Sequence, residues 1–335
     1  MSSDSSPVMH LRAITHKLAT LPLLPTVVSR LLALSPESDN YLDEVYRLAQ
    51  QDPTFSIRLI QYAKVTSSSA QAAEKMNLKN ALARLGTRKI ASIITTMSFM
   101  DSFSPHSQSD KNLWVHSVMV AVISRRLATL MPDMDIDSEL LYISALLHDI
   151  GRFVIFQFIP DAPSEIEHTG VVTPNTLLNL ETTVSGTDHV QIGKEVCDRW
   201  DVPKSITDIV SLHHSIELPT ETVAERQLAN KICLIQIADG YSMFLMNNLP
   251  VNEETEEENA FLTAILEHDL QKIDDIADEL EILITSCCSC LPTKHKVGLI
   301  KRLILETHSI FAEVDDLLAG LGFGFQRFSS RLIKQ

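Results

Sequence analysis

The stretch LLHDIGR, residues 146–152, places adjacent histidine and aspartate side chains within an otherwise apolar run from Leu140 to Ile159. The run is apolar enough to suggest a membrane span, but it carries His148, Asp149 and Arg152 near its middle. Each of these groups is costly to place in lipid. We therefore expect the run to be a buried segment of a protein that does not enter a membrane.

The sequence around this run has the apolar spacing of α-helices. Leu78 to Leu85 and Arg88 to Phe99 are predicted as two helices split at Gly86, and Leu140 to Ile150 as another that Gly151 can end. Period-2 alternation, which is typical of strands, is nearly absent. The pattern therefore predicts an all-α fold.

Composition limits the classes of partner and the cellular location. The chain has 335 residues with 43 acidic and 28 basic side chains, so its formal net charge is −15. This charge argues against broad nucleic-acid binding but allows a small phosphate ligand at a local site. Residues Met1 to Pro7 have no signal-peptide pattern, and three of the five cysteines crowd together at Cys287, Cys288 and Cys290. We expect a cytoplasmic protein with reduced thiols.

Seven ionisable residues fall on or beside the apolar faces of expected helices. They are His116, His148, Asp149, His189, His213, His214 and Asp239. Each alone has an ordinary interpretation, as a hydrogen-bonded core histidine or a helix-capping aspartate. Together, two buried carboxylates and five imidazoles would satisfy one another best around a cation such as Zn, Mn or Fe. The residues by themselves leave both a hydrogen-bonded core and a metal site open.

The order of four of these residues resembles the signature of the HD phosphohydrolase superfamily. The series consists of His116, then His148 and Asp149 in LLHDIGR, then Asp239 in IQIADGYS. The resemblance implies that these four side chains hold one divalent transition metal ion (Fe, Mn or Zn).

The remaining histidines resemble those of dinuclear members of the superfamily. They are His189 in GTDHVQIGKEV and the adjacent pair His213 and His214. The resemblance implies that these three residues hold a second ion and that Asp149 bridges the two. We therefore expect one or two bound ions.

The N-terminal half narrows the resemblance to the HD-related output domain, the HDOD family of bacterial signalling proteins. The segments that carry it are LPLLPTVVSRLLAL (21–34), LAQQDPTFSIRLIQYA (48–63), LKNALARLGTRKIASII (78–94) and WDVPKSITDIVSLHH (200–214). The resemblance covers about Leu18 to Leu245. It implies an HD-type multi-helix bundle with an N-terminal helical subdomain.

We expect four regions, which are an N-terminal segment (1–17), an HDOD-like domain (18–250), an acidic linker (251–259) and a C-terminal helical region (260–335). The HDOD-like domain is expected to consist of a helical part at about 18–103 and a metal core at about 110–250. The linker contains the run NEETEEEN, and amphipathic helices are expected at Ala260 to Cys288 and Lys296 to Leu318. We expect this C-terminal region to pack on the body as a helical appendage. A homodimer contact through the apolar stripe of this region is the alternative, and the stripe consists of Leu262, Ile265, Leu266 and Leu270.

Two functions from different classes follow from the resemblance. HDOD proteins are usually described as signalling output modules, so the first is a cytoplasmic regulatory module that binds a partner protein or a nucleotide, with metal in a structural role. The second is a metal-dependent phosphohydrolase or phosphodiesterase acting on a nucleotide or other phosphoester, with Asp149 and Arg152 as catalytic residues. Arg152 would steady phosphate charge, though a guanidinium cannot serve as a general acid. We favour the first function, because ligand retention shows a capacity to bind metal and not turnover.

The sequence departs from the cyclic-di-GMP phosphodiesterase branch of the superfamily. That branch has a lysine three residues after its aspartate, where this chain has Arg152. It continues its histidine pair into an ERxDGxGYP stretch, where this chain has SIELPTE. It also tends to carry a carboxylate one helical turn before the first histidine, at the place of Asn112. Specificity for cyclic di-GMP is therefore not expected.

Overall fold

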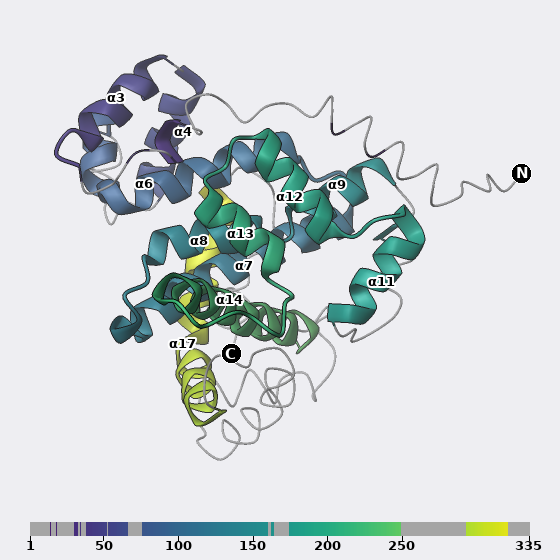
Figure 1. Ribbon diagram of the computed structural model, residues 1–335. Helices are drawn as coiled ribbons and strands as arrows, with labels where there is room; N and C mark the ends of the chain where they lie inside the picture. Colours follow the sequence, from purple (N-terminus) through teal and green to yellow (C-terminus); the bar gives the residue numbers. More distant parts are fainter. Residues whose placement is uncertain are drawn as a thin grey trace, which may run out of the picture. The chain divides into compact units, whose positions relative to one another are not determined.

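The computed structural model consists of helices joined by turns, with no strand among the residues that it describes (Figure 1). These are residues 38–51, 53–65, 76–159, 174–248 and 293–320, with positions 14, 18, 30–32, 34, 162 and 163. The predicted all-α fold is confirmed. In chain order the elements are α3 (Tyr41–Gln51), α4 (Pro53–Val65), α6 (Leu78–Ser102), α7 (Gln108–Leu130), η1 (Pro132–Met134), α8 (Ser138–Leu147), α9 (Ile150–Phe158), α11 (Pro174–Ser185), α12 (His189–Arg199), α13 (Lys204–Leu212), α14 (Val223–Asn248) and α17 (Thr293–Gly320).

Capping residues and a glycine determine where several of these helices begin or break. Asn77 caps α6, because its side chain accepts a hydrogen bond from the Asn80 backbone N–H at 2.9 Å. Asp188 caps α12 in the same way, through the Gln191 N–H at 2.9 Å. Gly86 breaks α6 as predicted, with a φ of 74° that glycine adopts without strain.

The apolar run from Leu140 to Ile159 forms two helices, α8 and α9, and not one continuous helix. His148 and Asp149 occupy the turn between them. The expectation that Gly151 ends a helix is wrong, because Gly151 lies in the first turn of α9.

One compact unit consists of residues Met1–Asp110, Leu147–Ser211 and Leu318–Phe323. Within it α3, α4 and α6 pack on one another, and α12 packs on α9 (Figure 1). Phe99 of α6 and Phe103, which follows the end of α6, contact the Phe153 ring of α9, with ring centroids 4.9 and 5.6 Å apart. Phe103 also lies 6.0 Å from Trp200, at the C-terminal end of α12. These aromatic contacts join three helices in one apolar core.

The backbones of α9 and α12 approach very closely at Gly151. A Cβ atom placed there would lie 2.0 Å from the carbonyl oxygen of His189 and 2.8 Å from its Cα. Only glycine fits, because any side chain would overlap main-chain atoms that cannot rotate away. The contact sets the start of α12 beside the start of α9, and it therefore brings His189 next to Asp149.

A second compact unit consists of residues Lys111–Leu146, Leu212–Leu317 and Gly324–Gln335. Within it α17 contacts both α7 and α14. The Arg126 guanidinium on α7 pairs with Glu306 on α17 at 3.1 Å. The hydroxyl groups of Tyr241 on α14 and Thr307 on α17 hydrogen-bond at 2.6 Å. α17 is therefore held by buried and half-buried polar contacts as well as by its apolar face.

The helix predicted from Lys296 to Leu318 is observed as α17, and its apolar face is buried. The residues that form this face include Leu299, Ile300, Leu303, Ile304, Ile310, Phe311 and Val314. The predicted helix from Ala260 to Cys288 and the acidic linker lie outside the described residues. The part of α17 up to Leu317 thus packs within the second unit.

The length and apolar composition of α7 are only weak evidence that this helix spans a membrane. By length and composition this helix could cross a membrane, but 78% of its most apolar 18-residue window is buried within the fold. A core helix of a globular protein meets the same criteria.

Two cysteines of the described residues have different states. Cys197 on α12 is a free thiol, and burial raises its pKa to about 12. Cys233 on α14 is disulfide-bonded, so the expectation of reduced thiols is wrong for this residue. Cys287, Cys288 and Cys290 lie outside the described residues.

Replacing Gly151 with alanine should destabilise the protein, because the added Cβ meets the His189 backbone. We expect a loss of about 1–3 kcal/mol, as for an overpacked core, measured by urea unfolding. Gly298→Ala on α17 is the matched control, since its Cβ would meet nothing within 4 Å. It should leave stability unchanged or raise it by up to about 1 kcal/mol, because alanine is the better helix former. Equal effects of the two changes would contradict the close approach.

Candidate metal centre

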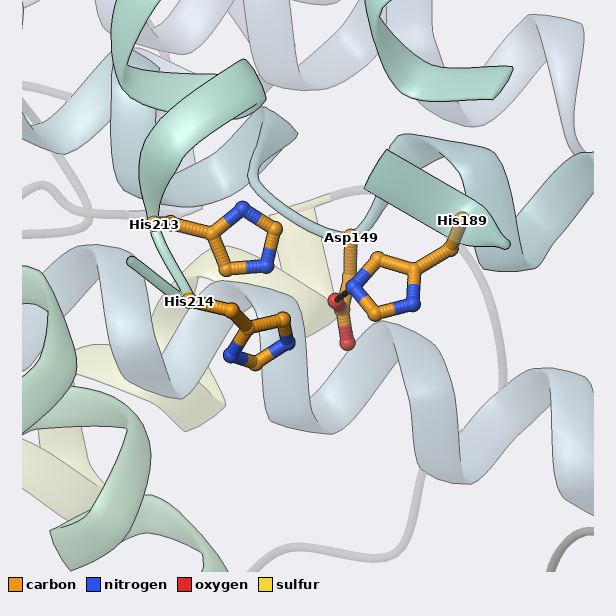
Figure 2. Close-up of side chains that lie close together, drawn as sticks. All are labelled: Asp149, His189, His213 and His214. Carbon is orange, nitrogen blue, oxygen red and sulfur yellow. Dashed lines mark ion pairs between the residues drawn. The ribbon is translucent and has the colours of Figure 1, made fainter. Parts of the chain in front are cut away.

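Asp149 stands at the N-cap position of α9, yet its side chain makes no capping hydrogen bond. Its Oδ1 lies 3.3 Å from His189 Nε2 and 3.7 Å from His148 Nε2. Its Oδ2 accepts a hydrogen bond from Arg152 Nη1 at 3.2 Å. Figure 2 shows the carboxylate and the His189 ring facing each other. The ordinary explanation of Asp149 as a helix cap therefore fails, and the carboxylate belongs to a side-chain cluster.

The cluster in the first unit is almost fully removed from water. The side chains of His148 and His189 are exposed to 1% and 0%, and that of Asp149 to 5%. One carboxylate oxygen thus faces two imidazole nitrogens in a dry environment. Imidazole and carboxylate are donors that Zn, Mn and Fe accept, and each of these three side chains belongs to a group of residues that could hold a metal ion.

Glu181 on α11 is a further member of this cluster, and its side chain is fully buried. Its Oε2 accepts a hydrogen bond from the His189 backbone N–H at 3.0 Å and lies 2.5 Å from His189 Nδ1. Its Oε1 lies 3.5 Å from Arg152 Nε. Arg152 therefore pairs with two carboxylates, and its guanidinium also lies 5.5 Å from the centre of the Phe156 ring.

The protonation of His189 reflects these two carboxylates. Burial lowers the pKa of His189, but the charges of Glu181 and Asp149 together outweigh burial and the opposing charge of Arg152, so the pKa lies above its ordinary value. An ion bound at Nε2 would take the place of a proton there, because a ligating imidazole must be neutral.

The second unit holds the other predicted ligands. His116 on α7 is buried, with its Nε2 3.2 Å from Asp239 Oδ1 and its Nδ1 3.1 Å from Ser242 Oγ. Asp239 and Ser242 lie three residues apart on α14, so they share one face of that helix. Each ring nitrogen of His116 thus has a defined partner, which fixes the orientation of the imidazole.

His213 and His214 follow the end of α13, and their ring centroids lie 4.1 Å apart. Figure 2 shows the two rings next to each other. The side-chain amide of Gln236 donates to the backbone carbonyl oxygens of His213 and Ser215, at 2.8 and 3.0 Å. His213 is buried and His214 is half-buried. The Gln236 contact therefore fixes the backbone that carries the pair.

Each unit therefore brings some of the predicted ligands together. The first unit gathers His148, Asp149 and His189, with Arg152 against the carboxylate. The second unit pairs His116 with Asp239. It also places His213 beside His214. All seven predicted ligands have donor types that could hold a metal ion.

Three polar residues of the site escaped the sequence analysis. They are Glu181, Gln236 and Ser242. A signal existed for Glu181, because it interrupts the apolar face formed by Leu177, Leu178 and Val184 at helical spacing. No comparable signal marks a serine or a glutamine on a buried helix.

The chain belongs to the HDOD domain family, which matches residues 21–216, more than half of the chain. An uncharacterized protein of Treponema pallidum (strain Nichols) is 22% identical over 209 residues. The match covers 61% of this chain and 39% of that protein, so the chain spans well under two thirds of the relative's length.

Several solved structures share the fold. An HDOD domain protein of unknown function from Geobacter sulfurreducens has a TM-score of 0.62 at 20% identity, covering 92% of this chain and 98% of its own. A candidate phosphohydrolase from Shewanella amazonensis SB2B has a TM-score of 0.60 at 17% identity, covering 93% and 99%. A candidate signal transduction protein from Marinobacter aquaeolei VT8 has a TM-score of 0.61 at 17% identity, covering 95% and 68%. At these identities the likeness shows the fold alone.

Replacing Ser242 with alanine should lower the free energy of unfolding by about 0.5–1.5 kcal/mol, because the buried His116 Nδ1 loses its partner. Ser124→Ala on α7 is the matched control. Among the described residues the buried Ser124 hydroxyl has no hydrogen-bond partner, so its removal should be neutral or stabilising. Thermal unfolding of both variants measures the difference, and an equal response would contradict the assigned His116 contact.

Proposed function

We propose that this chain is a bacterial HDOD-type signalling or regulatory protein that holds a divalent transition metal in its HD-type site. The observation that carries the proposal is the Asp149 carboxylate, which is buried, does not cap its helix, and directs one oxygen at two imidazole nitrogens. A buried carboxylate in this setting needs positive charge nearby. A metal ion would supply that charge.

The proposed ligands form two sets. His116, His148, Asp149 and Asp239 would hold one ion, and His189, His213 and His214 would hold a second, with Asp149 shared. Their donor types support Fe, Mn or Zn as the ion. The Arg152 hydrogen bond occupies Oδ2 of Asp149, so Oδ1 is the oxygen available for sharing.

The surroundings of Arg152 support a regulatory role over a catalytic one. A catalytic arginine would have to meet the phosphate of a substrate. Here the guanidinium pairs with Asp149 and Glu181 and lies over Phe156. These contacts give Arg152 a structural role in the protein interior. The ligand of the module would then be a nucleotide or a protein partner, in the bacterial cytoplasm.

A phosphohydrolase acting on a nucleotide or another phosphoester is the second candidate, and the complete set of seven donors favours it. A bound transition metal supplies a water of lowered pKa and polarises a phosphoryl oxygen. Asp149 would then be a catalytic ligand, and Arg152 would turn from its carboxylates to steady phosphate charge. The fold shared with a candidate phosphohydrolase of Shewanella is consistent with either function.

Two measurements separate these functions. Elemental analysis of the purified protein should find Fe, Mn or Zn. A screen of phosphomonoesters, phosphodiesters and nucleotides with added Mn²⁺ or Fe²⁺ should find no turnover above that of an Asp149→Ala control. Turnover that depends on Asp149 would overturn the regulatory proposal in favour of the hydrolase, and a protein free of metal after purification and reconstitution would overturn both.

Replacing Asp149 with alanine should remove most of the bound metal and the stability that metal binding adds, because the ligands lose a shared anion. His116→Ala should also lower metal content if ligands of both units contribute. Asp188→Ala is the matched control, since the Asp188 carboxylate caps α12 and accepts hydrogen bonds from the backbone and side-chain N–H groups of Gln191. It should cost about 1 kcal/mol of stability and leave metal content unchanged. A stable Asp149→Ala protein with wild-type metal content would refute the proposed site.

A further inference from the structure

Both carboxylate oxygens of Glu181 contact residues that lie next to the proposed metal site. Oε2 contacts His189 twice, at the backbone N–H and at ring Nδ1. Oε1 lies 3.5 Å from the Nε of Arg152. A fully buried carboxylate is costly to maintain, and these contacts are all directed to two residues that touch Asp149.

The contact with His189 decides which ring nitrogen can bind an ion. An ionised carboxylate only accepts hydrogen bonds, so the Nδ1 that faces Glu181 carries the hydrogen. When the ring is neutral, the opposite nitrogen, Nε2, has the lone pair, and it lies 3.3 Å from Asp149 Oδ1. Metal-ligating histidines commonly have such a carboxylate behind them, which holds the ring and raises its basicity.

The contact with Arg152 extends this effect to Asp149. The guanidinium uses Nε toward Glu181 and Nη1 toward Asp149 Oδ2. With Oδ2 held by Arg152, the other oxygen of Asp149 is directed at the imidazoles. The guanidinium thus contacts both carboxylates, Glu181 through an ion pair at 3.5 Å and Asp149 through a hydrogen bond at 3.2 Å.

We infer that Glu181 is a positioning residue of the metal site, which orients His189 directly and Asp149 through Arg152. The inference rests on the proposed function, since it concerns the same ions. Among the described residues the proposed ligand that Glu181 contacts is His189, and its role is to hold two ligand atoms toward one point. The close contact of Gly151 with the His189 backbone braces the same residue from α9.

A purely structural role for Glu181 makes a different prediction. The carboxylate also holds the start of α12 to α11, through the His189 backbone N–H. If that were its only role, its replacement would lower stability and leave metal affinity and the state of the His189 ring unchanged. Affinity and ring state are therefore the measurements that distinguish positioning from scaffolding.

The test uses the full chain with Glu181→Gln and Glu181→Leu. Glu181→Gln keeps the size and one acceptor oxygen but removes the charge, whereas Glu181→Leu removes both. We expect affinity for Mn²⁺ or Zn²⁺, measured by competition with a chelator, to fall about 10- to 100-fold in both variants. We expect the nitrogen chemical shifts of His189 in the metal-free wild type to report a hydrogen on Nδ1, and we expect this signature to change in both variants.

Glu139→Gln is the matched control, because Glu139 is a buried carboxylate that also pairs with an arginine, Arg125, at 3.4 Å. It should lower the melting temperature and leave metal affinity unchanged. If the wild type binds neither ion, the proposed metal site is wrong and the inference fails with it. If the wild type binds and Glu181→Gln binds equally well with an unchanged His189 signature, the inference alone is overturned. Should Glu181→Leu fail to fold, Glu181→Gln decides.

Discussion

The burial of the Asp149 carboxylate is the constraint on which the first unit depends. Such a group costs several kcal/mol in the interior unless cations and donors replace its lost water. Arg152 supplies one cation, and the imidazoles of His148 and His189 supply two nitrogens. Arg152 and His189 in turn need Glu181, whose carboxylate joins them. The need to compensate the buried charge of Asp149 therefore links three parts of the chain. They are the turn between α8 and α9, the start of α12 and a buried side chain of α11.

The cluster in the first unit combines two carboxylates with one permanent cation. The pKa of His189 is raised for this reason, since a proton on its ring offsets the remaining negative charge. A metal ion would provide the same compensation with more charge. In the second unit His116 meets Asp239 and Ser242, again with both ring nitrogens partnered. Both units thus orient histidines through their second nitrogen, which is how metal sites fix the geometry of their ligands.

Membership of the HDOD family and the environment of Arg152 point to the same kind of function. The chain belongs to the HDOD family, and the Arg152 guanidinium is engaged by Asp149 and Glu181. A site of this kind can stabilise a helical scaffold as well as it can catalyse the hydrolysis of a phosphoester. A regulatory module gains from such a site because metal binding adds stability to the conformation that the partner recognises.

The amino-acid sequence determined the features that depend on neighbours within a few residues. Helical periodicity predicted the all-α fold, the glycine at position 86 predicted the break in α6, and a histidine on the apolar stripe of α7 indicated a buried imidazole at His116. The order of the histidines and aspartates also indicated the family and the ligand types. These features are local because helix formation and caps involve residues at most four positions apart.

Only the tertiary structure decided which side chains meet. Asp149 occupies a capping position, which is the ordinary interpretation of such an aspartate taken alone, but its carboxylate turns instead to Arg152 and two imidazoles. Gly151 was expected to end a helix, whereas its missing side chain admits the backbone of α12. Glu181 became a partner of His189 through the short turn that joins α11 to α12, and Ser242 met His116 from a helix far along the chain. Such contacts depend on how helices pack and which way side chains point, and no short-range pattern encodes either.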